Sequence, residues 1–334
     1  MKSRNCLLRG LLLSLLFLTG TANAQHHDTD DATPAYAPTP PVLYAGGVRS
    51  LRDVIFAEPL GFRPLTLDLY LPPDSAAKKT VVVFIHGGAW RSRTARDGGV
   101  IRDFPAALAS VAARNYVVAS VNYRLSGEAR FPAAVQDVAL AIRWLRIHAD
   151  RYGIDINKFV AWGSSAGGQI AALLGTGCGA PAFEPQAPAA AQGQLPSICV
   201  QGVIDWYGAV DLESAGKDLS KADVPDYVKT YLGCDLPQCP AGWVRSASPF
   251  PYIDAKDPPF LIQHGAADTT VSPSQSKRLY EALRAAGVPA EFVIYPGVAH
   301  GFAKVPGGGP DDAINKQAMD KVFEYLGRYF PPGK

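Results

Sequence analysis

The sequence lacks long apolar runs, an excess of one charge and internal repeats. Its apolar N-terminal stretch, residues 11–18, is much shorter than the about 20 residues that a membrane-spanning helix needs, so no membrane span is expected. The 32 basic and 30 acidic residues leave a formal net charge of +2, which gives no reason to expect a nucleic acid as partner. With 48% hydrophobic and 19% charged residues, the chain is expected to be globular.

The first residues are typical of a secretory signal peptide. A basic start is followed by the apolar run Leu11–Leu18 and by Ala22-Asn23-Ala24, which fits a small-residue cleavage site. We therefore expect residues 1–24 to be removed and the mature chain to be secreted or periplasmic; the alternative is an uncleaved anchor. Removal takes away three basic residues, so the formal charge falls to about −1.

A proline-rich segment follows the signal. Residues 25–48 are expected to form a flexible tail, and residues 49–334 a single catalytic domain. His26 and His27 could bind a metal ion, but a solvated leader is the favoured interpretation because the surrounding residues show no apolar periodicity.

Few cysteines are present, and one of the five, Cys6, leaves with the signal. The other four allow three pairings, of which Cys178–Cys199 and Cys234–Cys239 are favoured because each pair brackets one loop. Neither spacing resembles a zinc site, so no metal is expected.

From about residue 54, apolar runs typical of strands alternate with amphipathic stretches. This order predicts a mostly parallel, doubly wound sheet with helices on both faces. Strands are expected at residues 65–70, 81–85, 117–121, 159–162, 203–207, 260–263 and 292–294, and helices at 104–114, from 132, and at 166–174, 274–286 and 311–329.

Two segments interrupt the alternation. Residues 178–199 and about 208–258 begin beyond the carboxyl ends of strands, where open α/β sheets bind ligands. The second is too long for a plain crossover, so we expect a small lid-like insertion that shapes a ligand site; the alternative is surface decoration.

A G-x-S-x-G motif, Gly163–Gly167, lies between an expected strand and an expected helix. In that context Ser165 is the expected nucleophile, on a turn so tight that glycines must flank it. Ser164 is excluded because Trp162 would then occupy a glycine position.

A serine hydroxyl needs an adjacent base, and the order Ser, acid, His along the chain is required in this context. Only His300 follows a suitable acid. Asp268 is the expected acid because it comes directly after a strand, whereas Asp257 precedes that strand and Asp205 lies within an apolar one. His86 and His264 are expected to hold loops.

Backbone N–H groups are expected to stabilise the developing oxyanion. Ala166 follows the nucleophile, and Gly88 and Ala89 lie in a glycine turn after the strand at 81–85. Trp90 either lines the pocket or anchors this turn. Trp206 and Tyr207 end a strand near the nucleophile, so these aromatic side chains are expected to form a substrate-binding wall.

Together these motifs resemble the hormone-sensitive-lipase-like carboxylesterases of the α/β-hydrolase superfamily, and more closely their bacterial feruloyl and acetyl-xylan esterase-like branch. The resemblance covers about residues 65–330 and rests on His86–Trp90, Tyr123-Arg124, Phe131–Ala134, Gly163–Gly168, Asp268 and Ala299–Phe302. The usual third glycine of the oxyanion turn is Ala89 here.

The resemblance implies an α/β-hydrolase fold and a serine ester hydrolase that needs no cofactor. Short-acyl or aromatic esters are the expected substrates, including feruloyl or acetyl esters linked to plant polysaccharide. Two alternatives are a serine peptidase of the same fold and a non-catalytic binding protein.

Overall fold

The computed structural model describes residues 40–73, 77–185, 195–215, 217–219, 225–305 and 308–333. The expected signal peptide, residues 1–24, lies outside the described residues, as does the expected tail up to residue 39. Within the described ranges, none of the helices is both long enough and apolar enough to span a bilayer.

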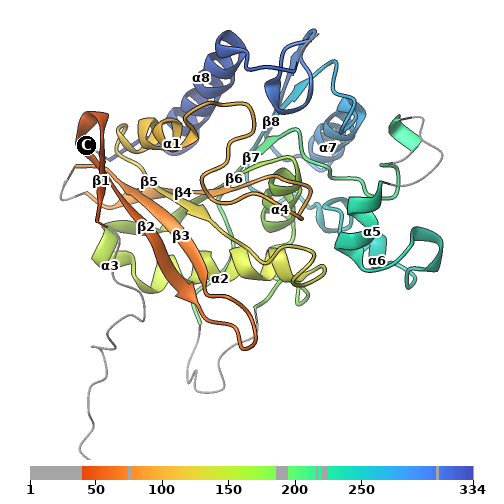
Figure 1. Ribbon diagram of the computed structural model, residues 1–334, viewed down its shortest axis with the longest axis horizontal. Coiled ribbons are helices and arrows are strands. Elements are labelled where there is room, and N and C mark those ends of the chain that lie inside the picture. Colours follow the sequence, from red (N-terminus) through yellow and green to blue (C-terminus); the bar gives the residue numbers. More distant parts are fainter. Residues whose placement is uncertain are drawn as a thin grey trace, which may run out of the picture. The chain divides into compact units, whose positions relative to one another are not determined.

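One mixed sheet organises the described chain (Figure 1). Its strands run in the order β1-β2-β3-β5-β4-β6-β7-β8-β9. The first three pairings are antiparallel, and every pairing from β5 to β9 is parallel. The bounds are Val42–Tyr44 (β1), Val48–Ala57 (β2), Leu65–Leu71 (β3), Lys79–Ile85 (β4), Val117–Val121 (β5), Ile154–Ser164 (β6), Gly202–Trp206 (β7), Phe260–Gly265 (β8) and Ala290–Tyr295 (β9). The mostly parallel sheet predicted from the sequence is confirmed.

The strands β1 and β2 correct the expected boundary of the tail. Residue 48 is not its end, because Val42 pairs with Ser50 and Tyr44 pairs with Val48 in an antiparallel edge. A 3₁₀ turn, η1 (Ala45–Gly47), joins the two strands. The charged residues Arg49, Arg52 and Asp53 break the apolar alternation of β2, which is why the sequence does not mark this segment as a strand.

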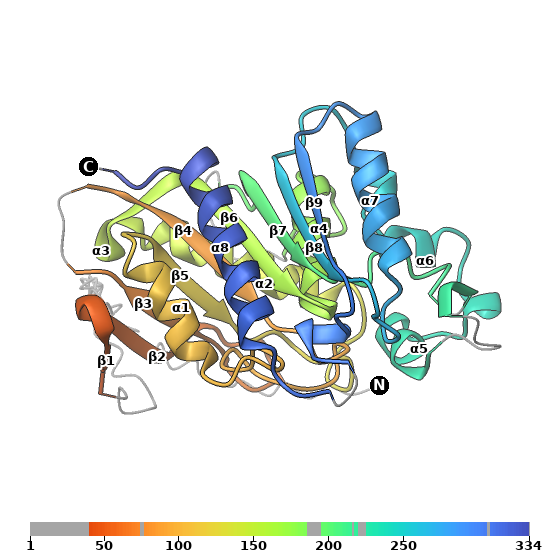
Figure 2. The ribbon, with the colours of Figure 1, turned by 90° about the horizontal axis from the view of Figure 1, so that it is seen from above.

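Helices cover both faces of the sheet (Figure 2), as the sequence predicts. Alternate residues of β4 explain why: Val82 and Phe84 belong to a core cluster that includes residues of α1 and α8, whereas Val83 and Ile85 belong to a second cluster that includes residues of α2, α4 and α7. The helices are α1 (Phe104–Ala112), α2 (Ala133–Ile147), α3 (Ala149–Tyr152), α4 (Ala166–Thr176), α7 (Pro273–Ala285) and α8 (Asp312–Tyr329).

The expected insertion at residues 208–258 lies between β7 and β8. Its described residues form η2 (Lys217–Leu219), α5 (Asp226–Leu232), η3 (Leu236–Gln238), α6 (Trp243–Ser246) and η4 (Phe250–Tyr252). Tyr231 of α5 is buried and stacks on Trp90 with ring centroids 4.2 Å apart. The insertion therefore packs against the loop that follows β4.

Both favoured disulfides are present. Cys178 and Cys199 bridge the segment after α4, and Cys234 and Cys239 bridge η3 within the insertion. The two bonds close loops with sequence separations of 21 and 5 residues.

Candidate active site

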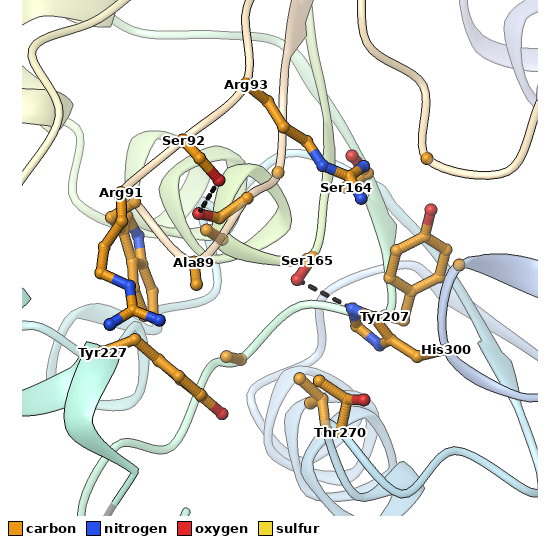
Figure 3. Close-up of a pocket in the computed structure, with 18 of the residues that line it drawn as sticks. Ala89, Arg91, Ser92, Arg93, Ser164, Ser165, Tyr207, Tyr227, Thr270 and His300 are labelled. Carbon is orange, nitrogen blue, oxygen red and sulfur yellow. Dashed lines mark hydrogen bonds between the residues drawn. The ribbon is translucent and has the colours of Figure 1, made fainter.

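Ser165 occupies a sharp turn between β6 and α4. Its φ of 54° is in the left-handed region, which is strained for a residue with a side chain. The flanking glycines are sterically required: a Cβ at Gly163 would lie 2.0 Å from the carbonyl oxygen of Gly167, and one at Gly167 would lie 2.0 Å from that of Ile85. The turn directs the Ser165 side chain into a pocket (Figure 3).

His300 and Asp268 meet at this serine. The hydroxyl of Ser165 lies 3.0 Å from His300 Nε2, and His300 Nδ1 lies 2.7 Å from Asp268 Oδ2. With Nδ1 protonated, His300 donates to the carboxylate while Nε2 accepts from the serine. His300 stands in η5 (His300–Phe302) after β9, and Asp268 stands after β8, so parallel strands bring all three predicted residues to one edge of the sheet.

The carboxylate of Asp268 is buried and held on both oxygens. Its Oδ1 accepts from the backbone N–H groups of Thr270 and Val271, at 2.8 and 2.9 Å. Burial alone would raise its pKa, but hydrogen bonds from His264 and His300 outweigh burial and lower the pKa well below its ordinary value. Asp268 is therefore ionised throughout the neutral range.

His264 forms a second contact with this carboxylate. Its Nε2 lies 3.1 Å from Asp268 Oδ2 and 3.0 Å from the carbonyl oxygen of Val271, while Ser276 Oγ lies 2.7 Å from Nδ1. The sequence predicts a loop-holding role for His264, and the structure places it directly on the acid.

The other two carboxylates considered from the sequence lie elsewhere. Asp205 is fully buried in β7, where its Oδ1 accepts from the N–H of Gly208 at 2.9 Å and burial raises its pKa to about 7. Asp257 precedes β8 and lines a different pocket, beside Cys178 and Cys199. No hydrogen bond between His300 and either carboxylate is found among the described residues.

The loop after β4 presents backbone donors opposite the serine. Gly88, Ala89 and Trp90 all have positive φ, at 102°, 54° and 56°. A Cβ at Gly88 would lie 2.3 Å from the carbonyl oxygen of Ser92, so only glycine fits there. Gly88, Ala89 and Ala166 line the pocket, and no hydrogen bond found within the described ranges occupies their N–H groups.

His86 braces this loop, as the sequence predicts. Its Nδ1 lies 2.8 Å from the carbonyl oxygen of Gly87, and its ring stacks on Tyr123 with centroids 4.3 Å apart. The Tyr123 hydroxyl donates to the carbonyl oxygen of His86 at 3.0 Å. Burial lowers the pKa of His86 to about 4, so the ring is neutral at physiological pH.

The pocket beside Ser165 has a volume of about 290 Å³. Trp90 and Tyr207 line it, and the Tyr207 ring packs edge-on against His300 at 4.9 Å. Trp206 does not line it, which corrects the expectation of a substrate contact: as the last residue of β7 it packs in the core against Trp162 and Phe302, whereas Tyr207 lies beyond the strand with a φ of 45°.

The sequence analysis misses several lining residues, among them Arg91, Arg93, Tyr227 and Thr270. The two arginines directly follow the glycine turn and Thr270 follows Asp268 by two residues, so their positions in sequence contain the signal. Tyr227 comes from the insertion, and no local pattern marks it. Within the described part of the chain, no three His, Cys, Asp or Glu side chains gather as metal ligands would.

Comparisons with known proteins find a family and relatives of this chain. The family model BD-FAE matches residues 67–283. The chain is 30% identical to the esterase LipC of Mycobacterium tuberculosis, over 82% of this chain and 66% of LipC. It spans between 54% and 66% of the length of the first curated relatives that it matches.

Two solved structures are similar over most of the chain. A bifunctional GH43-CE protein of Bacteroides eggerthii is 29% identical with a TM-score of 0.68, covering 84% of this chain and 38% of that one. A thermophilic esterase of Thermogutta terrifontis, solved with propionate bound, is 27% identical with a TM-score of 0.66, covering 83% and 93%. These matches and the mostly parallel sheet confirm the α/β-hydrolase fold.

Proposed function

The chain belongs to the BD-FAE family, and from this membership and the geometry at Ser165 we propose that it hydrolyses carboxylic esters through an acyl-enzyme. The observation that carries the proposal is the continuous hydrogen-bonded relay from Ser165 through His300 to the buried, ionised Asp268. A serine hydroxyl becomes a useful nucleophile only beside such a base.

Acylation begins when His300 Nε2 takes the hydroxyl proton and Ser165 Oγ attacks the ester carbonyl carbon. The carbonyl oxygen becomes an oxyanion, held by the N–H groups of Gly88, Ala89 and Ala166. The intermediate collapses, the carbon–oxygen bond to the alcohol breaks, and His300 returns its proton to the leaving alkoxide. Asp268 keeps the imidazole in the reactive tautomer and stabilises its positive charge.

Deacylation repeats these steps with water. His300 removes a proton from the water molecule, hydroxide adds to the acyl carbon, and Ser165 Oγ leaves with the proton that His300 returns. The acid product departs and the resting hydrogen bonds re-form. The three donors are backbone groups, two on the braced loop after β4 and one at the start of α4, so the site requires no reorganisation during reaction.

Short-acyl or aromatic esters suit the pocket best, including feruloyl or acetyl esters of plant polysaccharide. A volume of about 290 Å³ is small, and Trp90 and Tyr207 offer aromatic faces for stacking. The propionate bound to the Thermogutta terrifontis esterase supports a short acyl group.

The proposal includes export of the protein from the cytosol. Residues 1–24 act as a cleavable signal, and the catalytic domain then begins at the sheet rather than at residue 49. The two disulfides favour an oxidising compartment, because such bonds form and persist outside the cytosol.

The decisive experiment replaces the nucleophile. Ser165→Ala should lower kcat on p-nitrophenyl acetate by at least about a thousandfold while the far-UV spectrum is unchanged. Ser110→Ala is the matched control, because Ser110 lies on α1 and outside the pocket. A fluorophosphonate should label Ser165 in the wild type. Labelling at Ser164, or full activity in Ser165→Ala, would exclude the mechanism.

Substrate class is tested by a series of p-nitrophenyl esters from acetate to palmitate, run beside methyl ferulate and a peptide amide. Specificity should peak at the short acyl chains or at the aromatic ester. A maximum at about twelve carbons or beyond would contradict the pocket assignment. Preferential amide cleavage would identify a peptidase instead, and no turnover would support a binding protein.

A further inference from the structure

Two arginines, Arg91 and Arg93, line the pocket beside Ser165. Among the described residues, its lining contains no Asp or Glu. Within the described ranges, no ion pair joins either arginine to an acidic side chain. Asp268 lies behind the pocket, and its oxygens already accept from four N–H groups.

The neighbouring Arg96 shows that this loop can neutralise an arginine. Arg96 forms ion pairs with Asp53 at 2.8 Å and with Asp68 at 2.7 Å. Arg91 and Arg93 lie on the same loop and form no such ion pair with any acidic side chain that the structure describes. Because their charges are not neutralised by an ion pair, Arg91 and Arg93 give the pocket a positive electrostatic potential. The low-dielectric walls of the pocket strengthen its attraction for an anionic ligand.

Both side chains lie at the site, and the backbone conformation of Arg93 contributes to its position. Arg93 has a φ of 77°, a strained conformation for a residue with a side chain. A Cβ built on Gly99 would lie 3.5 Å from Arg93 Nη1 and 3.9 Å from the Tyr207 hydroxyl, so these two donors approach the same point of the lining. Figure 3 shows Arg93 beside Ser164, and Arg91 beside Tyr227 across the pocket.

The Arg93 guanidinium and the Tyr207 hydroxyl are both suited to binding a carboxylate. A guanidinium offers a planar pair of N–H donors that matches two carboxylate oxygens, and a tyrosine hydroxyl can add a third hydrogen bond. Arg91 also lies 6.0 Å from the centroid of the Tyr227 ring, which gives an aromatic surface beside the charge. The acyl-enzyme chemistry involves only the ester carbonyl, so a second anionic group is free to bind these donors.

We propose that the preferred substrates are esters that carry a carboxylate, which Arg91 and Arg93 bind on the acyl or the alcohol side of the scissile bond. This inference rests on the proposed ester hydrolysis at Ser165 and specifies its substrate class. It distinguishes the protein from an esterase that selects only by acyl length.

Two pairs of esters test the proposal and separate the two sides. Monomethyl glutarate and its amide, methyl glutaramate, differ only by an acyl-side charge. 4-Acetoxybenzoate and 4-acetoxybenzamide differ only by an alcohol-side charge. Acid release in a pH-stat gives kcat/KM for each ester. The readout is the anion preference of each enzyme, which is kcat/KM for the anionic ester divided by kcat/KM for the neutral ester of the same pair.

The wild-type ratio should exceed one for at least one pair, and that pair identifies the side. Arg91→Gln or Arg93→Gln should lower the ratio by up to about fivefold each, as expected for a partly exposed ion pair, and the double variant should lower it further. Raising the ionic strength to about 1 M should also lower it, because salt screens exposed charges. Arg93→Lys should retain part of the preference for the anionic ester, because lysine keeps the positive charge.

Arg284→Gln is the matched control, because Arg284 is exposed at the end of α7 and outside the pocket lining. A wild-type ratio at or below one for both pairs, or a ratio unchanged in the double variant, would overturn the proposal while leaving ester hydrolysis intact. If no ester were turned over, calorimetric binding of 4-acetoxybenzoate and 4-acetoxybenzamide to Ser165→Ala would decide it, since equal affinity refutes the subsite.

Discussion

Replacing Asp268 by Asn tests the acid of the proposed relay while keeping its shape. The carboxylate accepts hydrogen bonds from four N–H groups, two on each oxygen. An amide offers one oxygen and one NH₂, so either orientation places its NH₂ against two donors. To avoid this clash at Oδ2, His300 must move its proton from Nδ1 to Nε2. The nitrogen beside Ser165 then no longer accepts a proton.

The Asp268→Asn variant should lose both catalytic rate and folding stability, and the loss of rate should be the larger effect. Loss of the reactive tautomer and of the charge that stabilises the imidazolium should lower kcat by about ten-thousandfold, which is about 5.4 kcal/mol of transition-state stabilisation. Leaving buried donors without acceptors should lower the free energy of unfolding by about 1–3 kcal/mol. The variant therefore folds, with reduced stability, and is nearly inactive.

The assay is kcat/KM on p-nitrophenyl acetate, with urea unfolding measured in parallel. Asp205→Asn is the matched control, because Asp205 is equally buried, follows the nucleophile and makes no hydrogen bond to His300 among the described residues. Activity of Asp268→Asn within about tenfold of the wild type, or an equal loss in Asp205→Asn, would refute the assignment of the acid.

Three further predictions concern stability. Burial raises the pKa of Asp205 from 3.8 to about 7, so the folded state holds this proton more tightly than the unfolded state, and stability falls as the pH rises from about 4 to 7. Urea unfolding should show Asp205→Asn more stable above pH 7 by up to about 4 kcal/mol, and equal stabilities at pH 8 would contradict this. Gly167→Ala should cost about 1–3 kcal/mol in the same assay, because its Cβ would collide with the Ile85 carbonyl oxygen; an unchanged midpoint would show that the turn can relax. Replacing Cys178 and Cys199 by serine should cost about 3 kcal/mol for a loop of this length, more than replacing the Cys234–Cys239 pair, and the reverse order would refute the loop-length argument.

The parallel core of the fold could be predicted because its signals are local. Continuous apolar runs such as Val81–Ile85 are typical of strands buried on both faces, and their alternation with amphipathic helices fixes the doubly wound order. The tight turn at Ser165 was predictable for a similar reason, since glycines at fixed offsets are a steric requirement. His300 and Asp268 followed from the order of residues after successive parallel strands.

Features that depend on a partner from elsewhere in the chain could not be predicted. β2 contains charged residues, and only its pairing with β1 and β3 shows that it is a strand. Trp206 and Tyr207 are adjacent, buried aromatics that both pack against Phe302, yet of the two only Tyr207, which follows the end of β7, also lines the pocket. The contact of His264 with Asp268 requires the loop after β8 to turn back on itself, which no spacing rule predicts.

Gln169 shows how the insertion becomes part of the site. This fully buried side chain lies on α4, one turn after the nucleophile, and its Oε1 accepts from the Trp90 indole N–H at 3.1 Å. Its Nε2 donates to the carbonyl oxygen of Ala247, and the Tyr231 hydroxyl lies 3.5 Å from Oε1. One amide thus joins the loop after β4, the helix α4 and the insertion. A buried polar group is costly unless it is satisfied, so each segment depends on the other two to keep its position. This shared network and the stacking of Tyr231 hold the Trp90 side chain, so the insertion supports the loop that carries the proposed oxyanion donors in addition to lining the pocket through Tyr227.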